Sequence, residues 1–413
     1  MRQNESTFVI ARLLAIFAMI LFLVVNAVAA NGAEKVLYRF QGGSDGSAPF
    51  AGLVADPAGN LYGTTADGGN SACGSGCGTV FKLSHNSNGT WTETQLYSFK
   101  AGNDGAIPEA GVIFDSAGNL YGTTIHGGPS NDGTVFRLTP PTKPGRVWTE
   151  TVLYDFVGNR DGEYCLGSLT FDTAGNLYGA AVFGGIYGGG TVFQLVPPTQ
   201  GEMWSLNVLH SFKGTDDGID PLGALIFDRT GALYGETYDG AVFRLKPPAG
   251  HGVWTLDVIY RAGSVASAGA LLAAKPGVLY GTSSLGGGAN EGTIFQLTPP
   301  SKPGQPWGAV TLYEFAGGTD GEYPLNGLVT DRSGNLYGTT QGGGMFDAGT
   351  VFRLTPPAIP GDPWTKTTLY VFEGGRDGAG PGAGVIFGPR GALLGTTEAG
   401  GNSDNGTVFA VAP

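Results

Sequence analysis

The sequence predicts an all-β protein, a seven-bladed β-propeller with four-stranded blades in which the N-terminal strand closes the last blade. A cassette of D-x-x-G-N-L-Y-G-T-T, then G-T-V-F-x-L, then a Trp-led strand ending in L-Y-x-F recurs seven times. Each cassette holds four short runs with strand character, and such units repeated radially are typical of propellers. The glycines that close the L-Y-G segment mark the repeats: Gly63, Gly122, Gly179, Gly235, Gly281, Gly338 and Gly395.

The four runs are clearest in the second unit, at residues 111–115, 119–124, 134–138 and 148–156. Asp115 and Gly118 bound the first turn, because Asp favours the start of such a turn and Gly its left-handed corner. One unit is too small to bury its own apolar faces, so the units must pack on each other. We expect a single propeller domain over residues 34–413, with units beginning near residues 36, 91, 148, 204, 254, 307 and 364.

The fourth run carries aromatic residues at fixed offsets from its tryptophan. Six residues after each Trp stands a Tyr or His, and eight residues after it stands a Phe in all units but one. Even offsets share one face of a regular strand, so we expect these rings to lie together and to pack between blades. A stacking platform for a ligand is the alternative. The tryptophans are Trp91, Trp148, Trp204, Trp254, Trp307 and Trp364.

The ends of the chain predict how the ring closes. The first L-Y-x-F run, residues 36–40, lacks its Trp, and the chain ends after the last G-T-V-F segment without a Trp strand. We therefore expect the first strand to complete the last blade, which leaves no open sheet edge.

The N-terminal segment predicts export. Arg2 and Arg12 precede an apolar run over residues 13–25, followed by an A-x-A site near Ala29 and Ala30. Thirteen apolar residues are short for a bilayer span of about 20, so residues 1–33 are interpreted as a signal peptide with a short leader. An uncleaved membrane anchor is the alternative. We expect a secreted or periplasmic monomer with no stable membrane span after signal removal.

Charge and cysteines give two further expectations. The formal net charge of −12 makes a nucleic-acid partner unfavourable, because an acidic body repels phosphate backbones. Cys73 and Cys77 lie in an insertion of the first unit and are a disulfide candidate in an oxidising compartment. Two free thiols are the alternative, and Cys165 is expected to be unpaired. No cofactor and no metal site are expected.

The repeated G-N-L-Y-G-T-T, G-T-V-F-x-L, W-T-E-T-x-L-Y-x-F and G-x-D-G segments resemble the GloVer tandem repeat of secreted bacterial proteins. This resemblance covers nearly all of the chain after the signal segment and implies export and a propeller-like fold. It implies no activity. The D-x-x-G-N-L-Y segment also looks like the inner hairpin of streptogramin-lyase-like and gluconolactonase-like propellers, but no catalytic residue of those enzymes is matched here.

The loops before the first and third strands of each unit are expected to share one face, which is the better binding candidate because its loops are longer and more varied. It should carry a ring of carboxylates, each followed by Gly. They form a candidate cation- or sugar-binding rim, or else they cap local backbone N–H groups. These residues are Asp45, Asp104, Asp161, Asp217, Asp320 and Asp377.

Departures from the repeat are the better pointers to a site. The fourth unit has a short loop through Asp239 and Gly240 and replaces a Thr with Glu236, while the fifth lacks the Asp-Gly motif around residues 262–267. We expect these changes to open a notch near blades 4 and 5, with simple repeat decay as the alternative. The third and sixth units share Asp-Gly-Glu-Tyr, which adds further rim candidates, and His126 alone among the histidines is expected to face the rim. The added rim candidates are Glu163, Tyr164, Glu322 and Tyr323.

The leading functional hypothesis is an exported, non-catalytic propeller that binds a glycan, an envelope component or a surface protein, or serves as a scaffold. The alternative is a secreted hydrolase or lyase with an acidic site on the loop face near blades 4 and 5. A third hypothesis is a structural surface protein without a small ligand. The Gly-rich segments follow strands but open no helix, so they are not a dinucleotide fingerprint.

Overall fold

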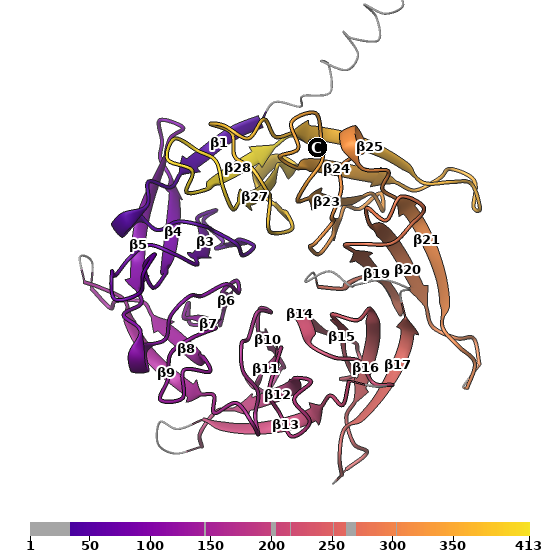
Figure 1. The fold of residues 1–413 in the computed structure, drawn as a ribbon, viewed down its shortest axis with the longest axis horizontal. Helices are drawn as coiled ribbons and strands as arrows, with labels where there is room; N and C mark the ends of the chain where they lie inside the picture. The colour runs from indigo at the N-terminus through magenta and orange to yellow at the C-terminus, as the bar shows by residue number, and fades with distance from the viewer. Residues whose placement is uncertain are drawn as a thin grey trace, which may run out of the picture.

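Seven four-stranded antiparallel sheets stand around a central axis (Figure 1). The structure, a computed structural model, describes residues 34–143, 146–199, 204–214, 216–250, 252–261, 270–302 and 304–413. The predicted signal segment therefore lies outside the described residues. Within them, no helix is long and apolar enough to cross a membrane.

The strands follow the four runs of the repeat from the axis outward. Blades 1 to 3 contain β2 (Val54–Ala55), β3 (Leu61–Thr65), β4 (Thr79–His85), β5 (Trp91–Ser98); β6 (Ile113–Phe114), β7 (Leu120–Thr124), β8 (Thr134–Thr139), β9 (Thr149–Asp155); and β10 (Thr170–Phe171), β11 (Leu177–Ala181), β12 (Thr191–Val196), β13 (Ser205–Ser211). Blades 4 and 5 contain β14 (Pro221–Phe227), β15 (Leu233–Thr237), β16 (Ala241–Lys246), β17 (Thr255–Arg261); and β18 (Leu272–Lys275), β19 (Val278–Ser283), β20 (Thr293–Thr298), β21 (Gly308–Glu314). Blades 6 and 7 contain β22 (Val329–Thr330), β23 (Leu336–Thr340), β24 (Thr350–Thr355), β25 (Thr365–Val371); and β26 (Ile386–Phe387), β27 (Leu393–Thr397), β28 (Thr407–Val411), β1 (Glu34–Arg39). Short 3-10 turns are η1 (Gly43–Asp45), η2 (Gly102–Asp104), η3 (Gly318–Asp320) and η4 (Pro389–Gly391).

The turn between the two inner strands depends on its first aspartate. In blade 1 the Asp56 carboxylate accepts hydrogen bonds from the backbone N–H groups of Ala58 and Asn60, both at 2.9 Å, and from the Tyr62 hydroxyl at 3.1 Å. Burial acts to raise the pKa of Asp56, but the bonds from Asn60 and its neighbours outweigh it and lower the pKa. The same arrangement recurs at Asp115, Asp172, Asp228 and Asp331.

The first strand of the described chain closes the ring, as predicted. β1 pairs antiparallel with β28, with Glu34 opposite Val411 and Arg39 opposite Thr407. In Figure 1 the indigo strand β1 accordingly lies beside the yellow strand β28. Blade 7 thus combines the two ends of the propeller, and β28 gains in β1 the outer-strand partner that the third strands of the other blades have.

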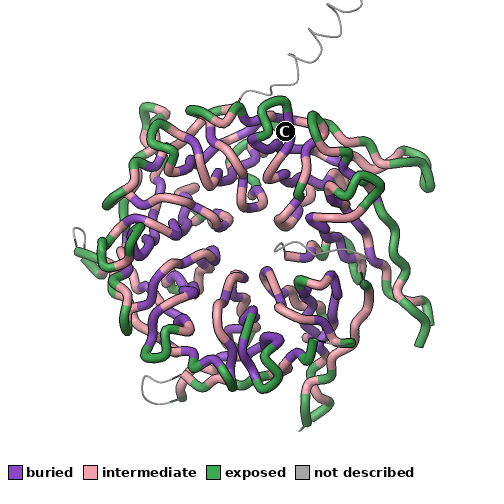
Figure 2. The backbone as a smooth tube through the Cα atoms, in the orientation of Figure 1, coloured by how far each residue is buried: buried purple, intermediate pink, exposed green. Residues whose placement is uncertain are grey.

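The core lies between neighbouring blades, and burial is concentrated in the inner and middle strands (Figure 2). At six of the seven blade junctions a phenylalanine at the end of the outer strand meets one on the third strand of the next blade, as Phe99 meets Phe136 at 5.1 Å between ring centroids. The contact of Phe40 with Phe81 at 5.1 Å repeats this across the closure. A side chain at Gly63 would place its Cβ 2.7 Å from Phe81 Cζ, which explains why the L-Y-G segment needs its glycine.

The expectation that the outer-strand aromatics share one face is wrong. In β5, Phe81 pairs with Gln95 while its neighbour Val80 pairs with Tyr97, so the strand carries a one-residue bulge at Leu96. A bulge shifts the alternation of side chains. The tryptophan consequently packs on the preceding blade, as Trp204 does on Tyr121, whereas the Tyr and Phe face the following blade. Interblade packing itself is confirmed.

Candidate functional site

The loops before the first and third strands of a blade meet on one face of the ring, which we call the loop face. In blade 2 Ala106 and His126 form a β-bridge between these loops, and in blade 3 Glu163 and Phe183 do so. The two N–H···O bonds between Glu163 and Phe183 measure 3.0 and 3.2 Å. The predicted sharing of one face by the two loop sets is therefore confirmed.

The rim carboxylates are bound within their own loops. Asp45 accepts the Tyr38 hydroxyl at 2.6 Å and the Gln41 backbone N–H at 2.6 Å. The same pair of donors, a side chain seven residues earlier and a backbone N–H four residues earlier, serves Asp104, Asp161, Asp217, Asp320 and Asp377. In blade 3 the donor is His210 instead of a tyrosine, with Nε2 at 3.0 Å from Asp217. These contacts agree with the turn-capping alternative, and they give the repeated Tyr of the outer strand a defined partner.

One rim carboxylate also holds a buried cation. Lys366 Nζ lies 2.9 Å from Asp320 Oδ1 and 2.5 Å from the Asp320 carbonyl oxygen. Burial acts to raise the pKa of Asp320, but the Ala316 N–H and the Lys366 ammonium lower it overall. Burial conversely lowers the pKa of Lys366. At this junction the Lys366 ammonium neutralises the charge of the Asp320 carboxylate.

Tyr164 and Tyr323 occupy the same loop position in blades 3 and 6, next to Glu163 and Glu322. Both adopt a left-handed backbone, with φ of 59° and 57°. Burial, reinforced by Asp132, raises the pKa of Glu163, and burial together with Glu291 raises that of Glu322. The four residues lie on the loop face, as predicted. The neighbouring acid differs between the two blades: it is Asp132 beside Glu163 and Glu291 beside Glu322.

Glu236 does not lie on the rim, contrary to expectation. It is 2% exposed, and neither of its carboxylate oxygens has a hydrogen-bond partner among the described residues. Burial holds its pKa well above the ordinary value for glutamate. The reason is strand alternation: the position points toward the next blade, where in blade 1 the equivalent Thr64 donates to the Ala110 carbonyl at 3.0 Å.

The tight hairpin of blade 4 is confirmed, since the Gly240 N–H donates to the Thr237 carbonyl at 2.9 Å. The altered segment of the fifth unit, residues 262–267, lies outside the described residues, so the predicted notch stays a prediction. A cavity of about 440 Å³ does lie between blades 4 and 5, but it opens at the turns on the opposite face, beside Asp228, Tyr234 and Lys275.

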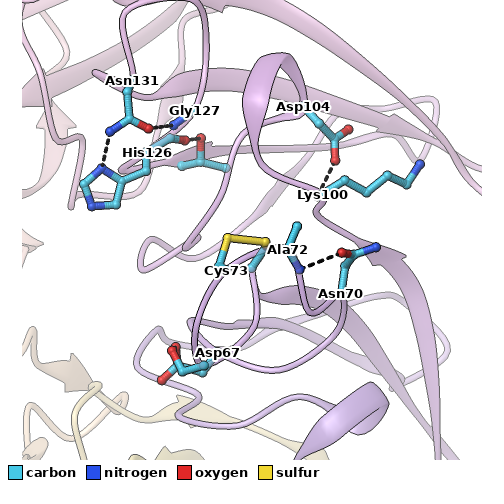
Figure 3. Close-up of a disulfide and its surroundings, with 12 residues drawn as sticks. Asp67, Asn70, Ala72, Cys73, Lys100, Asp104, His126, Gly127 and Asn131 are labelled. Carbon is cyan, nitrogen blue, oxygen red and sulfur yellow. Dashed lines mark hydrogen bonds between the residues drawn. A yellow bond between two sulfur atoms is a disulfide. The ribbon is translucent and has the colours of Figure 1, made fainter.

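The insertion of the first unit forms a small closed loop on the loop face. Cys73 and Cys77 are joined by a disulfide, and Cys165 is a buried free cysteine, both as predicted. Figure 3 shows this loop between Asp67 and the neighbouring loop that carries His126, whose ring nitrogen Nδ1 lies 3.4 Å from Asn131 Nδ2. Among the residues with described placement, no group of three or more His, Cys, Asp or Glu has the geometry of a metal site.

The axis of the ring is lined mainly by glycine and alanine. A cavity of about 340 Å³ is bordered by Gly52, Gly111, Gly167, Gly223 and their counterparts, and a Cβ at Gly167 would lie 2.0 Å from the Gly223 carbonyl oxygen, which leaves no room there for a side chain. Glu109 lines it as well, and burial, with Asp67 and Glu398 adding to it and His126 opposing it, raises the pKa of Glu109. Sequence reasoning missed Glu109; its place two residues before the axial Gly111 was the available signal.

These features define a seven-bladed β-propeller built from repeats, in which the strands are alike and the loop residues differ between blades. The chain belongs to the Gloeobacter/Verrucomicrobia repeat family, which matches residues 23–242 and 236–413 and confirms the resemblance drawn from the cassette. No functionally curated protein matches the sequence.

Solved structures resemble the chain in fold. A fungal alcohol oxidase of the AA5 family, in complex with copper, has a TM-score of 0.54 and 15% identity over 92% of this chain and 76% of its own. Two proteins named "putative 6-phosphogluconolactonase" are similar. That from Bacteroides fragilis NCTC 9343 has a TM-score of 0.51 and 16% identity, over 82% of this chain and 89% of its own. That from Bacteroides uniformis ATCC 8492 has a TM-score of 0.50 and 13% identity, with the same coverage of 82% and 89%. At these identities the likeness shows the fold alone.

Proposed function

We propose that this protein is an exported binding propeller whose loop face recognises a glycan or another envelope component. One observation carries the proposal: large exposed apolar side chains gather on the loop face. Eight of the 14 such residues in the described chain lie in its loops, including five of the six aromatic ones. Exposed apolar residues gathered on one face mark interaction sites. The eight are Val157, Phe183, Ile186, Tyr187, Tyr238, Tyr323, Met345 and Phe346.

The rim hydrogen bonds support this function by making the loops rigid. Each Asp ties its loop to the outer strand through a tyrosine or histidine and to the backbone. A loop held in its bound conformation loses less entropy when a ligand arrives. The symmetric residues thus hold the loops, and recognition falls to the side chains that differ between blades.

The compartment is part of the proposal. A short apolar N-terminal run, an acidic body and a disulfide in the first blade all suit a protein outside the cytoplasm. Intact-mass measurement of the exported protein should give a chain that begins near residue 30. A mature chain that retains residues 13–25 would contradict cleavage.

The hydrolase or lyase alternative relied on Glu236. A catalytic acid or base must come within hydrogen-bond reach of the substrate. At 2% exposure, Glu236 is better explained as a residue of the interface between blades 4 and 5.

The purified protein should be screened against a glycan array and against peptidoglycan sacculi and outer-membrane fractions. We expect retention on at least one of them, and loss of retention in a Tyr187→Ser/Phe346→Ser variant. An Ile359→Ser variant is the matched control, because Ile359 is 65% exposed but lies in a connector away from the loop face. Absence of retention on every surface, or equal loss in the control, would refute the proposed function.

A further inference from the structure

We propose that three ring side chains at the junction of blades 2 and 3, His126, Tyr164 and Phe183, form a binding site for a neutral carbohydrate chain. We call these three residues the aromatic strip. The inference rests on the proposed function and narrows it to one part of the loop face and one class of ligand.

The rings of the aromatic strip are in mutual contact. Tyr164 lies 5.1 Å from His126 and 5.8 Å from Phe183 between ring centroids, in edge-to-face geometry at 79° and 77°. Phe183 is 44% exposed, and His126 and Tyr164 are partly exposed. Rings that brace one another edge-to-face keep their orientation without a ligand, and the electron-rich faces of such rings attract the C–H groups of a sugar ring.

The backbone beneath the strip is fixed by hydrogen bonds among four loops. The Tyr164 N–H donates to the Asp132 carbonyl at 3.3 Å, and its carbonyl accepts the Val182 N–H at 3.1 Å. Phe183 is bridged to Glu163, and His126 to Ala106. The strip therefore belongs to the scaffold and is preorganised for binding.

Tyr164 stands where the backbone disfavours a large side chain. Its φ of 59° is left-handed, as it is at the equivalent Ala48 (53°), Ile107 (58°), Asp220 (55°), Tyr323 (57°) and Gly380 (60°). A bulky residue in this region is strained relative to glycine. The conformation is a feature of the repeat, so the case for binding rests on the ring contacts of Tyr164.

The surroundings of the strip indicate an uncharged, hydroxyl-rich ligand. Glu163 and Asp132 interact beside Tyr164, and Glu109 lies near His126 at the mouth of the axial cavity. Carboxylates accept hydrogen bonds from hydroxyl groups and repel uronate or sulfate. The net charge of −12 adds to this discrimination.

The strip continues outward along the blade 3 loop. Ile186 and Tyr187 are 67% and 55% exposed, and Lys213 Nζ lies 5.4 Å from the Tyr187 ring centroid. An aromatic strip with apolar residues at its outer end suits several sugar units in a chain better than a single monosaccharide.

The test is affinity electrophoresis of the full chain through gels that contain xyloglucan, mixed-linkage β-glucan, galactomannan or polygalacturonate. We expect retardation by at least one neutral polysaccharide and none by polygalacturonate. Tyr164→Ala and Phe183→Ala should each weaken binding about tenfold or more, the effect of losing a buried aromatic contact. Tyr164→Phe, which keeps the ring, should bind within about twofold of wild type.

Phe387→Ala is the matched control. Phe387 is 38% exposed and contacts Tyr337 edge-to-face at 5.5 Å between ring centroids, but it lies at the end of β26, on the face opposite the loop face. Its loss should leave affinity unchanged. Thermal unfolding of every variant identifies any that fail to fold.

The outcomes separate the two proposals. Equal weakening in Tyr164→Ala and Phe387→Ala, or binding of polygalacturonate as tight as that of a neutral polysaccharide, would overturn the aromatic-strip site while leaving a binding propeller. Retention on outer-membrane fractions with no neutral polysaccharide bound would do the same. No retention on any surface would overturn both.

Discussion

At the scale of residues, the repeat separates structural roles from candidates for function. A carboxylate that recurs in six blades with the same two donors is a structural residue, whereas Glu236 departs from its counterparts and Tyr164 matches Tyr323 alone among its own. Their environments differ sharply. Tyr164 is partly exposed among other rings, and Glu236 is buried with no partner among the described residues.

Replacing Glu236 with the threonine that five of the other six blades carry at this position should stabilise the protein. An unpaired buried polar group costs about 1–3 kcal/mol, and a threonine there would donate to the next blade, as Thr339 does to the Ala383 carbonyl at 2.9 Å. We expect Glu236→Thr to raise the free energy of unfolding by about 1–3 kcal/mol in urea titrations at pH 8. The gain should shrink toward pH 5, because the raised pKa of Glu236 lets the folded state keep a proton that the unfolded chain releases.

Two results would contradict this explanation of Glu236. One is a Glu236→Thr variant less stable than wild type at pH 8. The other is loss of ligand retention in a variant that folds normally, which would return Glu236 to the functional residues.

At the scale of elements, the strands and their order could be predicted because the same four-strand pattern recurs in all seven repeats. The one-residue bulge could not, since counting even offsets from Trp91 to Tyr97 assumes a regular strand, and Leu96 interrupts it. The partner of each rim Asp was in principle visible. A Tyr or His stands seven residues before it in every case, from Tyr38 and Asp45 onward.

The candidate site was predicted less well than the strands. Its face and the residues Glu163 and Tyr164 follow from the loops, but Phe183 was not singled out. Ring contacts between blades depend on how the ring brings loops together, and no spacing within one unit encodes that. The burial of Glu236 likewise depends on which face of β15 packs against the next blade.

Three adjacent outer strands place a glutamate beside a rim aspartate. Burial together with Asp377, Asp45 and Asp104 respectively raises the pKa of Glu34, Glu93 and Glu150 to about 7. One oxygen of each is buried and unpaired among the described residues. Lys366 occupies the matching position in β25, two residues after the tryptophan, and neutralises Asp320 instead.

These junctions should make stability depend on pH. The pKa of the three glutamates is raised from 4.5, so between pH 4.5 and 7 the folded protein holds protons that the unfolded chain has released. The free energy of unfolding should therefore fall as the pH rises through this range and level off above it. Partial exposure makes the effect smaller than for fully buried groups. Below this range the lowered pKa values of Asp56 and its counterparts act in the opposite sense.

A triple variant, Glu34→Gln/Glu93→Gln/Glu150→Gln, should flatten the pH dependence between pH 4.5 and 7 in denaturant titrations. The control is Glu373→Gln, which changes an exposed glutamate. This variant should leave the pH dependence of the free energy of unfolding unchanged. An unchanged slope in the triple variant would show that these glutamates are not the groups that titrate.

At the scale of the whole molecule, a closed ring explains how a chain of short strands holds a defined loop face. Every blade packs on two neighbours, and blade 7 is assembled from both ends of the propeller. The positions of the rim, the aromatic strip and the axial cavity all depend on that closure. The family match and the structural neighbours agree with the fold, and the proposed function rests on the loops.

Closure can be tested with a designed disulfide between the two end strands. Lys35 and Ala410 are direct antiparallel partners, so their Cα atoms lie within the range that a disulfide spans. The variant Lys35→Cys/Ala410→Cys should lose two hydrogens on oxidation, as intact mass shows, and should unfold at a higher temperature than its reduced form. A control, Lys35→Cys/Arg390→Cys, places the second cysteine in the η4 turn between the inner strands β26 and β27 and should stay reduced. A Lys35→Cys/Ala410→Cys protein that folds yet forms no disulfide, or bonds no faster than the control, would contradict a ring closed by its first strand.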